Sequence, residues 1–284
     1  MEINLAYSPC PNDTHIFHAM VHGLVDCEGI SFKTHLADVE ELNKKAQKGT
    51  FDVCKLSYHA YFTLLDKYIM LRSGSALGYG NGPLFVAKKD SEAFITNGPA
   101  NMNRIFDNPV LIPGELTTAS LLLKIAFPNI TNTVPLVFSS IEQELLNGNF
   151  MSGVLIHEGR FTYKERGLEL IADLGELWQT QTNLPIPLGG IAVSRKLDLN
   201  LQMAIGRVLK RSILYANENP EASNEYVCQY AQEMDKEVQR KHIKMFVNDF
   251  TIEIGEQGES AVKELLCRTC KIYPKIHSTG NLFI

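Results

Sequence analysis

The chain has 284 residues, which allows one large domain or two ordinary ones, and a chain of this length buries about three quarters of its unfolded surface without disulfides or a structural metal. Hydrophobic residues make up 45% and charged residues 21%, which excludes a disordered chain, a collagen and a coiled coil. With 27 basic and 32 acidic residues the net charge is −5 and no basic block is present, so nucleic acid is not an expected partner.

Targeting signals and cysteine usage predict a cytoplasmic protein without a metal. No apolar run approaches the roughly 18 residues of a membrane helix, so a membrane is not an expected partner. Residues 1–7 lack the basic start and apolar core of a secretion signal. Four of the six cysteines are scattered singly, and only Cys267 and Cys270 form a C-x-x-C pair. His277 alone would not complete a zinc site beside them, so we expect two reduced thiols.

Strand and helix patterns alternate along the first 90 residues. Apolar runs bounded by turn residues predict strands at residues 3–8, 30–36, 51–57, 69–73 and 84–88. Helices are predicted between them at residues 14–25, 38–48 and 58–65. Asp13 is the expected N-cap of the first helix.

A polar segment at residues 90–108, which contains Gly98-Pro99, predicts a crossover into a second domain. The alternation then restarts, with strands predicted at residues 110–112, 134–138, 153–156 and 168–172 and helices at residues 117–127 and 141–146. Residues 185–190 predict a second crossover into a strand at 191–194. The remaining pattern is helical, at residues 202–216, 220–234, 236–247 and 256–266.

This order predicts an α/β fold with mainly parallel sheets and helices on both faces. The two crossovers make residues 91–189 an inserted second lobe, while residues 1–90 and 190–284 together form the first lobe. That is the plan of a two-lobed binding protein with its ligand in the cleft between the lobes. Ligands of open α/β sheets bind beyond the carboxyl ends of strands, so the residues there form the candidate site.

Two strand ends of the first lobe carry polar residues. After residues 3–8, Pro9 and Pro11 hold a stiff loop that is either a capped turn or part of the cleft floor. At the end of residues 51–57, Lys55 and Ser57 can bond a polar ligand, and Ser57 can equally be a helix N-cap. The residue types do not separate these alternatives.

The second lobe offers an anion site and a general base. Gly114 precedes a helix whose first turn holds Thr117 and Thr118, and helix N-terminal amides favour anions. No basic residue accompanies them, which suits a carboxylate better than a polyphosphate. His157 follows a buried apolar strand, and its near-neutral pKa as a residue type makes it the best candidate base. Glu158 or a backbone carbonyl would orient its ring.

Three histidines lie at helical spacing near the N-terminus. His15, His18 and His22 share one helix face, which invites a metal-site interpretation. No cysteine or carboxylate partner stands out to complete such a site. A solvated or partly packed face is therefore the favoured interpretation.

Short motifs spread over nearly the whole chain match one known family in order. They lie at residues 8–14, 55–58, 77–78, 82–84, 113–114, 117–118, 156–158, 160–163, 184–190, 247–250 and 255–258. On these motifs the chain resembles the 1,4-dihydroxy-6-naphthoate synthase family of the futalosine route to menaquinone. The block from residue 157 to 163 is the most specific part and distinguishes it from the sister family that dehydrates chorismate.

The resemblance implies a fold, a site and a reaction. The family has the type II periplasmic-binding-protein fold and needs neither metal nor organic cofactor. It uses the histidine that matches His157 as proton acceptor. The positions that line its substrate site match Lys55, Leu56, Ser57, Thr117 and Thr118. The implied activity is that of a carbon-carbon lyase, which converts cyclic dehypoxanthine futalosine, a small-molecule carboxylate, to 1,4-dihydroxy-6-naphthoate and a three-carbon sugar fragment.

The chain departs from the family pattern at a few places. Tyr79, Gly80 and Asn81 differ from it in the middle of a glycine-rich loop, and Gly159 stands where a serine is common. Such departures affect rim contacts and substrate fit, while the base and the anion site keep their residues.

Two other functions fit the same fold. A non-catalytic solute-binding protein for an aromatic carboxylate is one, since one fold hosts many functions. The effector-sensing module of a regulator is the other, although the chain begins directly with its first predicted strand. A homodimer is compatible with the sequence, which does not determine the oligomeric state.

Overall fold

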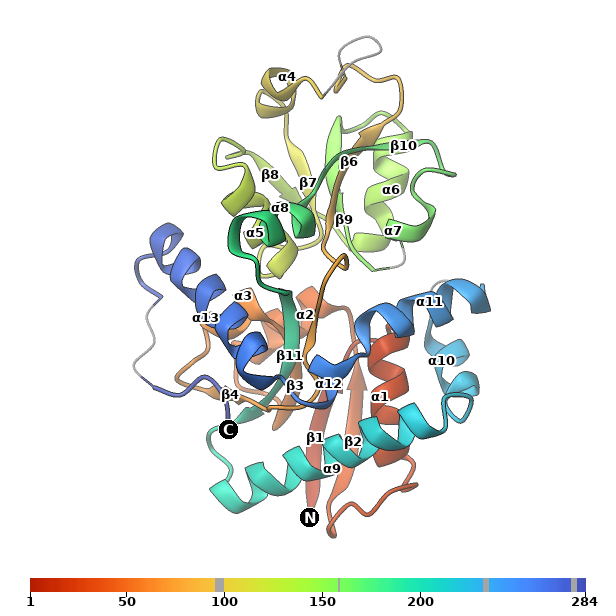
Figure 1. Ribbon diagram of the computed structural model, residues 1–284, viewed down its shortest axis with the longest axis vertical. Helices are drawn as coiled ribbons and strands as arrows, with labels where there is room; N and C mark the ends of the chain where they lie inside the picture. Colours follow the sequence, from red (N-terminus) through yellow and green to blue (C-terminus); the bar gives the residue numbers. More distant parts are fainter. Residues whose placement is uncertain (95–99, 158, 232–234, 277–279) are drawn as a thin grey trace. The chain divides into compact units, whose positions relative to one another are not determined.

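The computed structural model describes residues 1–94, 100–157, 159–231, 235–276 and 280–284. The chain divides into two compact units, each with its own sheet (Figure 1). Unit 1 comprises Met1–Gly78 and Pro187–Ile284, and unit 2 comprises Tyr79–Ile186. We placed the first boundary after residue 90. It lies twelve residues earlier because the strand Leu84–Lys88 pairs with strands of unit 2.

The sheet of unit 1 has the order β2-β1-β3-β11-β4, and β5 also pairs with β11. Its strands are β1 (Glu2–Tyr7), β2 (Ser31–Leu36), β3 (Val53–Ser57), β4 (Tyr68–Met70), β5 (Ala76–Gly78) and β11 (Ile186–Ser194). β1 runs parallel to β2 and β3, whereas β11 runs antiparallel to β3 and β4. The carboxyl ends of β1, β2 and β3 therefore share one edge.

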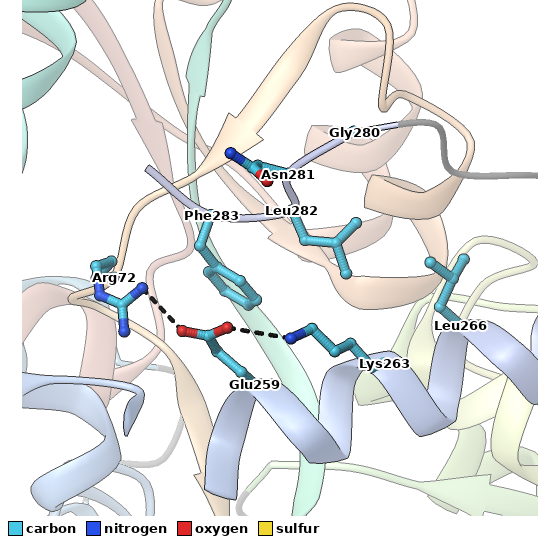
Figure 2. A pocket seen from close by; sticks show the side chains of 8 residues that line it. All are labelled: Arg72, Glu259, Lys263, Leu266, Gly280, Asn281, Leu282 and Phe283. Carbon is cyan, nitrogen blue, oxygen red and sulfur yellow. Dashed lines mark hydrogen bonds and ion pairs between the residues drawn. The ribbon is translucent and has the colours of Figure 1, made fainter. Parts of the chain in front are cut away.

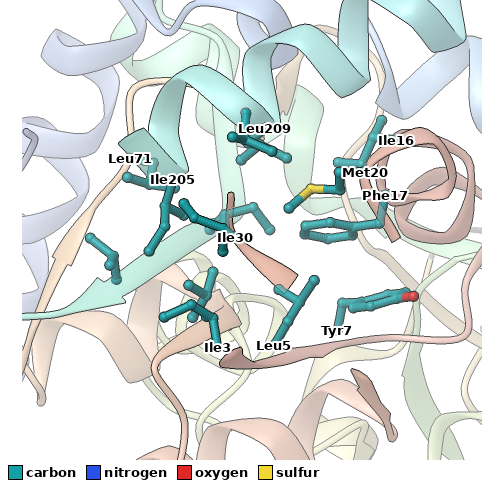
Figure 3. Close-up of a cluster of buried hydrophobic side chains, with 14 of the residues drawn as sticks. Ile3, Leu5, Tyr7, Ile16, Phe17, Met20, Ile30, Leu71, Ile205 and Leu209 are labelled. Atoms are coloured by element: carbon teal, nitrogen blue, oxygen red, sulfur yellow. The ribbon is translucent and has the colours of Figure 1, made fainter. Parts of the chain in front are cut away.

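The helices of unit 1 cover this sheet, and they make up most of the C-terminal segment of the unit. They are α1 (Pro11–Val21), α2 (Val39–Ala46), α3 (Tyr58–Phe62), α9 (Leu199–Glu218), α10 (Asn224–Tyr230), α11 (Lys236–Phe246), α12 (Asp249–Ile252) and α13 (Gly255–Ile272). α1 packs against α9, α10 and α11. Alternate residues of β1 meet α1 and α9 in a core that contains Leu5, Phe17 and Leu209 (Figure 3). Burying each such side chain contributes about 1.5–3 kcal/mol.

The sheet of unit 2 has the order β10-β6-β9-β7-β8. Its strands are β6 (Leu84–Lys88), β7 (Val110–Ile112), β8 (Thr133–Pro135), β9 (Ser152–Leu155) and β10 (Leu168–Asp173). β7 is parallel to β8 and β9, while β6 is antiparallel to β9 and β10. Both sheets are thus mixed where we expected mainly parallel ones, because β6 and β11 enter against the direction of their neighbours.

The helices of unit 2 are α4 (Met102–Phe106), α5 (Thr118–Ala126), α6 (Phe138–Leu146), α7 (Gly159–Thr162) and α8 (Leu174–Thr182). The sequence patterns did not predict α4, α7, α8, α12 or β5. α8 begins because the Asp173 carboxylate accepts from the backbone amides of Gly175 and Glu176, and it ends at Asn183 in the left-handed conformation. None of the described helices combines the length and apolar character needed to cross a membrane.

The starts of α1 and α10 differ from the predicted ones, whereas α2 begins within one residue of its predicted start. α1 begins at Pro11 with Cys10 as N-cap, so Asp13 lies inside its first turn and does not cap it. α10 begins at Asn224, four residues after Pro220, and the predicted end at residue 234 lies outside the described residues. Asp38 caps α2 as its side chain accepts from the Glu40 amide.

Candidate active site

Polar side chains beyond the end of β1 form a buried network in unit 1. Asp13 is its centre: one carboxylate oxygen accepts from Ser8 Oγ at 2.7 Å and the other from Lys55 Nζ at 2.6 Å. Asn12 Nδ2 donates to the same carboxylate at 2.8 Å, and Asn12 Oδ1 lies 2.9 Å from His242 Nε2 on α11. Asp13 is 0% and Lys55 7% exposed, so the ion pair is shielded from water. The carboxylate of Asp13 thus binds side chains of the network.

Lys55, Leu56 and Ser57, which the family resemblance implies for substrate binding, end β3 and are all buried. Ser57 forms two hydrogen bonds with Asn43 of α2, one through its backbone amide and one through Oγ, both 3.0 Å long. Ser57 occupies the N-cap position of α3, but its side chain makes no capping bond. The structure therefore brings these residues to the carboxyl edge of the unit 1 sheet with their positions fixed by neighbouring side chains.

In unit 2 the strand directions bring several candidate residues to one edge. β7 and β9 are parallel, so the loop that leads to Thr117 and the turn at His157 both follow carboxyl ends at that edge. β6 is antiparallel to β9, with Leu84 opposite Leu155. The beginning of β6 therefore lies beside the end of β9, and the sheet edge joins segments that are about 70 residues apart in sequence.

Thr117 is the N-cap of α5. Its hydroxyl donates to the Gly114 carbonyl at 2.8 Å and accepts from the Ser120 amide at 3.3 Å. Thr118 is the first residue of α5 and is 2% exposed. The side chain of Thr117 thus acts as a helix cap. The positive end of the α5 dipole remains a place where a carboxylate is favoured.

His157 lies two residues after the end of β9 and is half-buried. Its backbone has φ = 56°, a left-handed conformation that few non-glycine residues adopt. Its ring packs edge-on against Phe138, the first residue of α6, with 4.7 Å between ring centroids. A conformation that costs about 1–3 kcal/mol and persists is typical of functional turns. Glu158, the expected orienting partner, lies outside the described residues.

Arg160 has a place at this edge that the sequence did not reveal. Its guanidinium donates to the backbone carbonyl of Gly82 and lies 3.0 Å from the Asp173 carboxylate. A Cβ on Gly82 would stand 2.4 Å from the Cα of Gly175. Arg160 thus ties the turn after His157 to the segment before β6 and to the start of α8.

Of the three N-terminal histidines, His15 is buried, His18 half-buried and His22 exposed, which agrees with the expected solvated or partly packed face. His15 is 3% exposed and its Nδ1 lies 2.6 Å from Ser223 Oγ, while the rings of His18 and His22 are 4.6 Å apart. Burial lowers the pKa of His15 to about 4. Burial, and then the neighbouring His22, lower the pKa of His18.

The other sulfur and nitrogen ligands do not assemble in the described part of the chain. Cys267 and Cys270 are free thiols on α13, and His277 lies outside the described residues. Over the described ranges, no group of three or more histidine, cysteine, aspartate or glutamate residues is placed to hold a metal ion.

A separate pocket of about 470 Å³ lies in unit 1 (Figure 2). It is lined by Arg72, Glu259, Lys263, Leu266 and the C-terminal residues Gly280, Asn281, Leu282 and Phe283. Glu259 pairs with Arg72 at 2.8 Å and with Lys263 at 3.4 Å. None of the residues implied for catalysis or substrate binding lines this pocket.

The fold assigns the chain to a class. A solved Candida albicans protein, described as having the generic periplasmic binding protein fold, is 12% identical with a TM-score of 0.64, and the match covers 100% of this chain and 98% of that one. A solved Archaeoglobus fulgidus protein is 34% identical with a TM-score of 0.87, over 97% of this chain and 98% of that one. The chain is therefore an α/β protein of the periplasmic-binding-protein-like class.

Sequence comparisons then give the family. Residues 3–271 match the family model described as Menaquinone biosynthesis. A Thermus thermophilus 1,4-dihydroxy-6-naphthoate synthase is 40% identical over 263 residues, 93% of this chain and 92% of that protein. The Streptomyces coelicolor protein of the same name is 37% identical over 271 residues, 94% of this chain and 92% of that protein. The chain belongs to the 1,4-dihydroxy-6-naphthoate synthase family, whose members are enzymes of menaquinone synthesis.

Proposed function

We propose that this protein is the lyase that converts cyclic dehypoxanthine futalosine to 1,4-dihydroxy-6-naphthoate and a three-carbon sugar fragment, with His157 as general base. Family membership supports the reaction class. The observation that supports the assignment of the base is the position and backbone conformation of His157. It follows β9 at φ = 56° and lies at the sheet edge that also holds the start of α5.

Each implied residue has a chemical task in this reaction. The substrate carboxylate binds at the start of α5, near Thr117 and Thr118, where the helix dipole favours an anion. Ser57 and neighbouring backbone groups hold hydroxyls derived from ribose. The ammonium group of Lys55 has three donors, and one of them bonds Asp13. The others can bond a polar ligand.

His157 then takes a proton from the sugar-derived ring. The ring opens, the three-carbon fragment leaves, and aromatisation of the naphthalene drives the reaction forward. A positioned general base contributes about 10²–10⁴-fold to the rate. The reaction as written needs no metal or organic cofactor.

The test follows the naphthoate product by chromatography with mass detection after the purified protein is mixed with the substrate. His157→Asn is the best variant of the base, because asparagine adopts positive φ readily and so leaves the turn intact. We expect its turnover to fall at least about 100-fold while substrate still raises its melting temperature. His22→Ala, an exposed histidine on the neighbouring unit, is the matched control and keeps full turnover.

A second variant separates a base from a structural histidine. His157→Gly also tolerates positive φ and leaves room for added imidazole. Recovery of turnover with imidazole supports the base assignment. Near-normal turnover of His157→Asn would contradict the assignment of His157 as the base. A wild-type protein that makes no product would contradict the assignment of the lyase activity.

The fold also favours a second candidate, a binding protein for an aromatic carboxylate, since the Candida albicans protein of the same architecture is described by that fold. Tight binding of substrate without product from the wild type would favour it. Cell fractionation separates the two further: we propose a cytoplasmic enzyme, whereas a solute-binding protein would be exported or anchored.

A further inference from the structure

Asn81 is a buried amide whose hydrogen-bonding groups are unused. It is 2% exposed, and among the residues that the structure describes neither its Oδ1 nor its Nδ2 has a hydrogen-bond partner. Native proteins pair nearly all buried polar groups, because an unpaired one loses its bonds to water without replacement. An amide that is unpaired at both ends among these residues is therefore a candidate for binding a ligand.

The segment that carries Asn81 is held firmly, so its unpaired amide is not a loose side chain. Arg160 donates to the carbonyl of Gly82, the next residue, and is itself paired with Asp173. Leu174 donates its backbone amide to the Pro83 carbonyl at 3.0 Å. Gly82 lies so close to Gly175 that no side chain fits between them. The backbone on the C-terminal side of Asn81 is therefore fixed before any ligand binds.

The sheet of unit 2 places this segment with the other candidate residues. Leu84 is opposite Leu155, so Asn81 lies three residues before that pair and His157 two residues after it, at the same edge. Arg160, which holds Gly82, comes from the helical turn that follows His157. The start of α5 is at this edge too.

We infer that Asn81 is a substrate-binding residue of the proposed reaction, whose amide takes two neighbouring hydroxyls of the sugar-derived part of the substrate. An amide offers an acceptor and two donors, and a pair of hydroxyls can donate to one end and accept from the other. A hydrophobic group would leave both ends unpaired, and a purely anionic group would leave Oδ1 unpaired. The inference rests on the proposed function for the identity of the substrate.

The test is the steady-state kinetics of Asn81→Ala and Asn81→Asp with cyclic dehypoxanthine futalosine. Loss of two hydrogen bonds predicts that kcat/KM of Asn81→Ala falls about ten- to a hundred-fold. Asn81→Asp keeps the shape and the acceptor but loses the donor, so it falls less than the alanine variant. Asn149→Ala, an exposed asparagine of the same unit, is the matched control with unchanged kinetics.

A structural role would give a different result. The unliganded Asn81→Ala protein should melt no lower than the wild type, since no hydrogen bond among the described residues is lost. A substrate analogue that lacks one of the two hydroxyls should show little further loss with Asn81→Ala. Normal kcat/KM of both Asn81 variants in an active wild-type background overturns this inference alone. A wild type without activity instead overturns the proposed function.

Discussion

The two units use the same strand-end geometry in different ways. At the carboxyl edge of unit 1, the side chains of Ser8, Asp13 and Lys55 bind one another, and Ser57 is held by Asn43. At the corresponding edge of unit 2, His157 sits at positive φ and Asn81 has no hydrogen-bond partner among the described residues. At the first edge the polar groups therefore hold one another in a fixed frame, whereas at the second edge the amide of Asn81 is available for a ligand.

This difference predicts which variants change stability and which change activity. Removing one partner from the unit 1 network leaves another buried and unpaired, so the free energy of unfolding should respond most there. Replacing an available group of unit 2 should change turnover or KM with little change in stability. The following predictions test this division in order of decreasing effect.

Breaking the buried ion pair should have the largest effect. Lys55→Met leaves Asp13 charged and fully buried, which should lower the free energy of unfolding by about 3–5 kcal/mol. The double variant Asp13→Asn with Lys55→Met removes both charges and should recover much of that loss. Urea unfolding followed by circular dichroism measures both. A loss below about 1 kcal/mol for Lys55→Met would mean that the pair does not support the frame.

Acid should weaken unit 1 through His15. Burial lowers its pKa from 6.5 to about 4, so between these values the unfolded chain binds a proton that the folded chain does not. Stability therefore falls as the pH falls through this window, by about 2 kcal/mol between pH 7 and pH 5 for this group. His15→Gln should lose correspondingly less over the same range, while the lowered pKa of His18 leaves a smaller dependence in place.

Urea unfolding at pH 7, 6 and 5 checks this prediction. His35→Gln, a half-buried histidine of β2, is the control and should follow the wild type. Parallel pH curves for the His15→Gln and wild-type proteins would contradict the role of His15.

Local patterns were sufficient for elements whose signals are local. The strands at residues 84–88 and 110–112 have the predicted bounds, because each is a short apolar run between polar or turn residues. α2 begins within one residue of its predicted start, because its cap Asp38 bonds an amide only two residues away. The carboxyl-edge rule also led to Lys55, Ser57, Thr117 and His157 as residues to test.

Long-range partners explain what the patterns missed. Asp13 is a residue type that commonly caps helices, but its carboxylate instead forms an ion pair with Lys55, which is 42 residues away in sequence. The unit boundary moved because the partner strands of β6 come 60 or more residues later. Arg160 and Asn81 were not selected, since their significance depends on Gly82 and on an unpaired amide. Only a folded chain shows either feature.

Arg160→Met should reduce both stability and activity of unit 2. It removes the ion pair with Asp173, in which both side chains are at most 15% exposed, and the bond to the Gly82 carbonyl. Bonds to charged groups contribute about 1.5–3 kcal/mol, so we expect unit 2 to lose about 2 kcal/mol. Trp178, the single tryptophan, is buried in unit 2, and its fluorescence reports this loss.

Arg160→Lys tests whether geometry matters beyond charge. Lysine keeps the charge but cannot bond the carbonyl and the carboxylate with one rigid fork. If Arg160 positions Asn81, we expect both Arg160 variants to raise KM more than they lower kcat, and so to lower kcat/KM as expected for Asn81→Ala. Unchanged KM in a folded Arg160→Met protein would limit Arg160 to a structural role.

The smallest effect concerns Asp38. It differs from the other polar side chains at the carboxyl edge of unit 1, which form hydrogen bonds with one another. Its Oδ1 accepts from the Glu40 amide, but its Oδ2 is buried and has no hydrogen-bond partner among the described residues. Burial raises the pKa of this carboxyl, so the charged form is disfavoured and the stability that Asp38 contributes decreases as the pH rises. Asp38→Ala loses the cap and should cost about 1 kcal/mol.

The variant Asp38→Asn tests whether Asp38 only stabilises unit 1 or also binds the substrate. Asparagine caps a helix as well as aspartate and carries no charge to bury, so at pH 7 the variant should be at least as stable as the wild type. If Asp38 belongs only to the frame, kcat/KM of Asp38→Asn is unchanged. If Oδ2 instead accepts a substrate hydroxyl, kcat/KM falls although stability does not. Unit 1 would then hold one more group for the substrate besides Lys55 and Ser57, and the division between the two units would be one of degree.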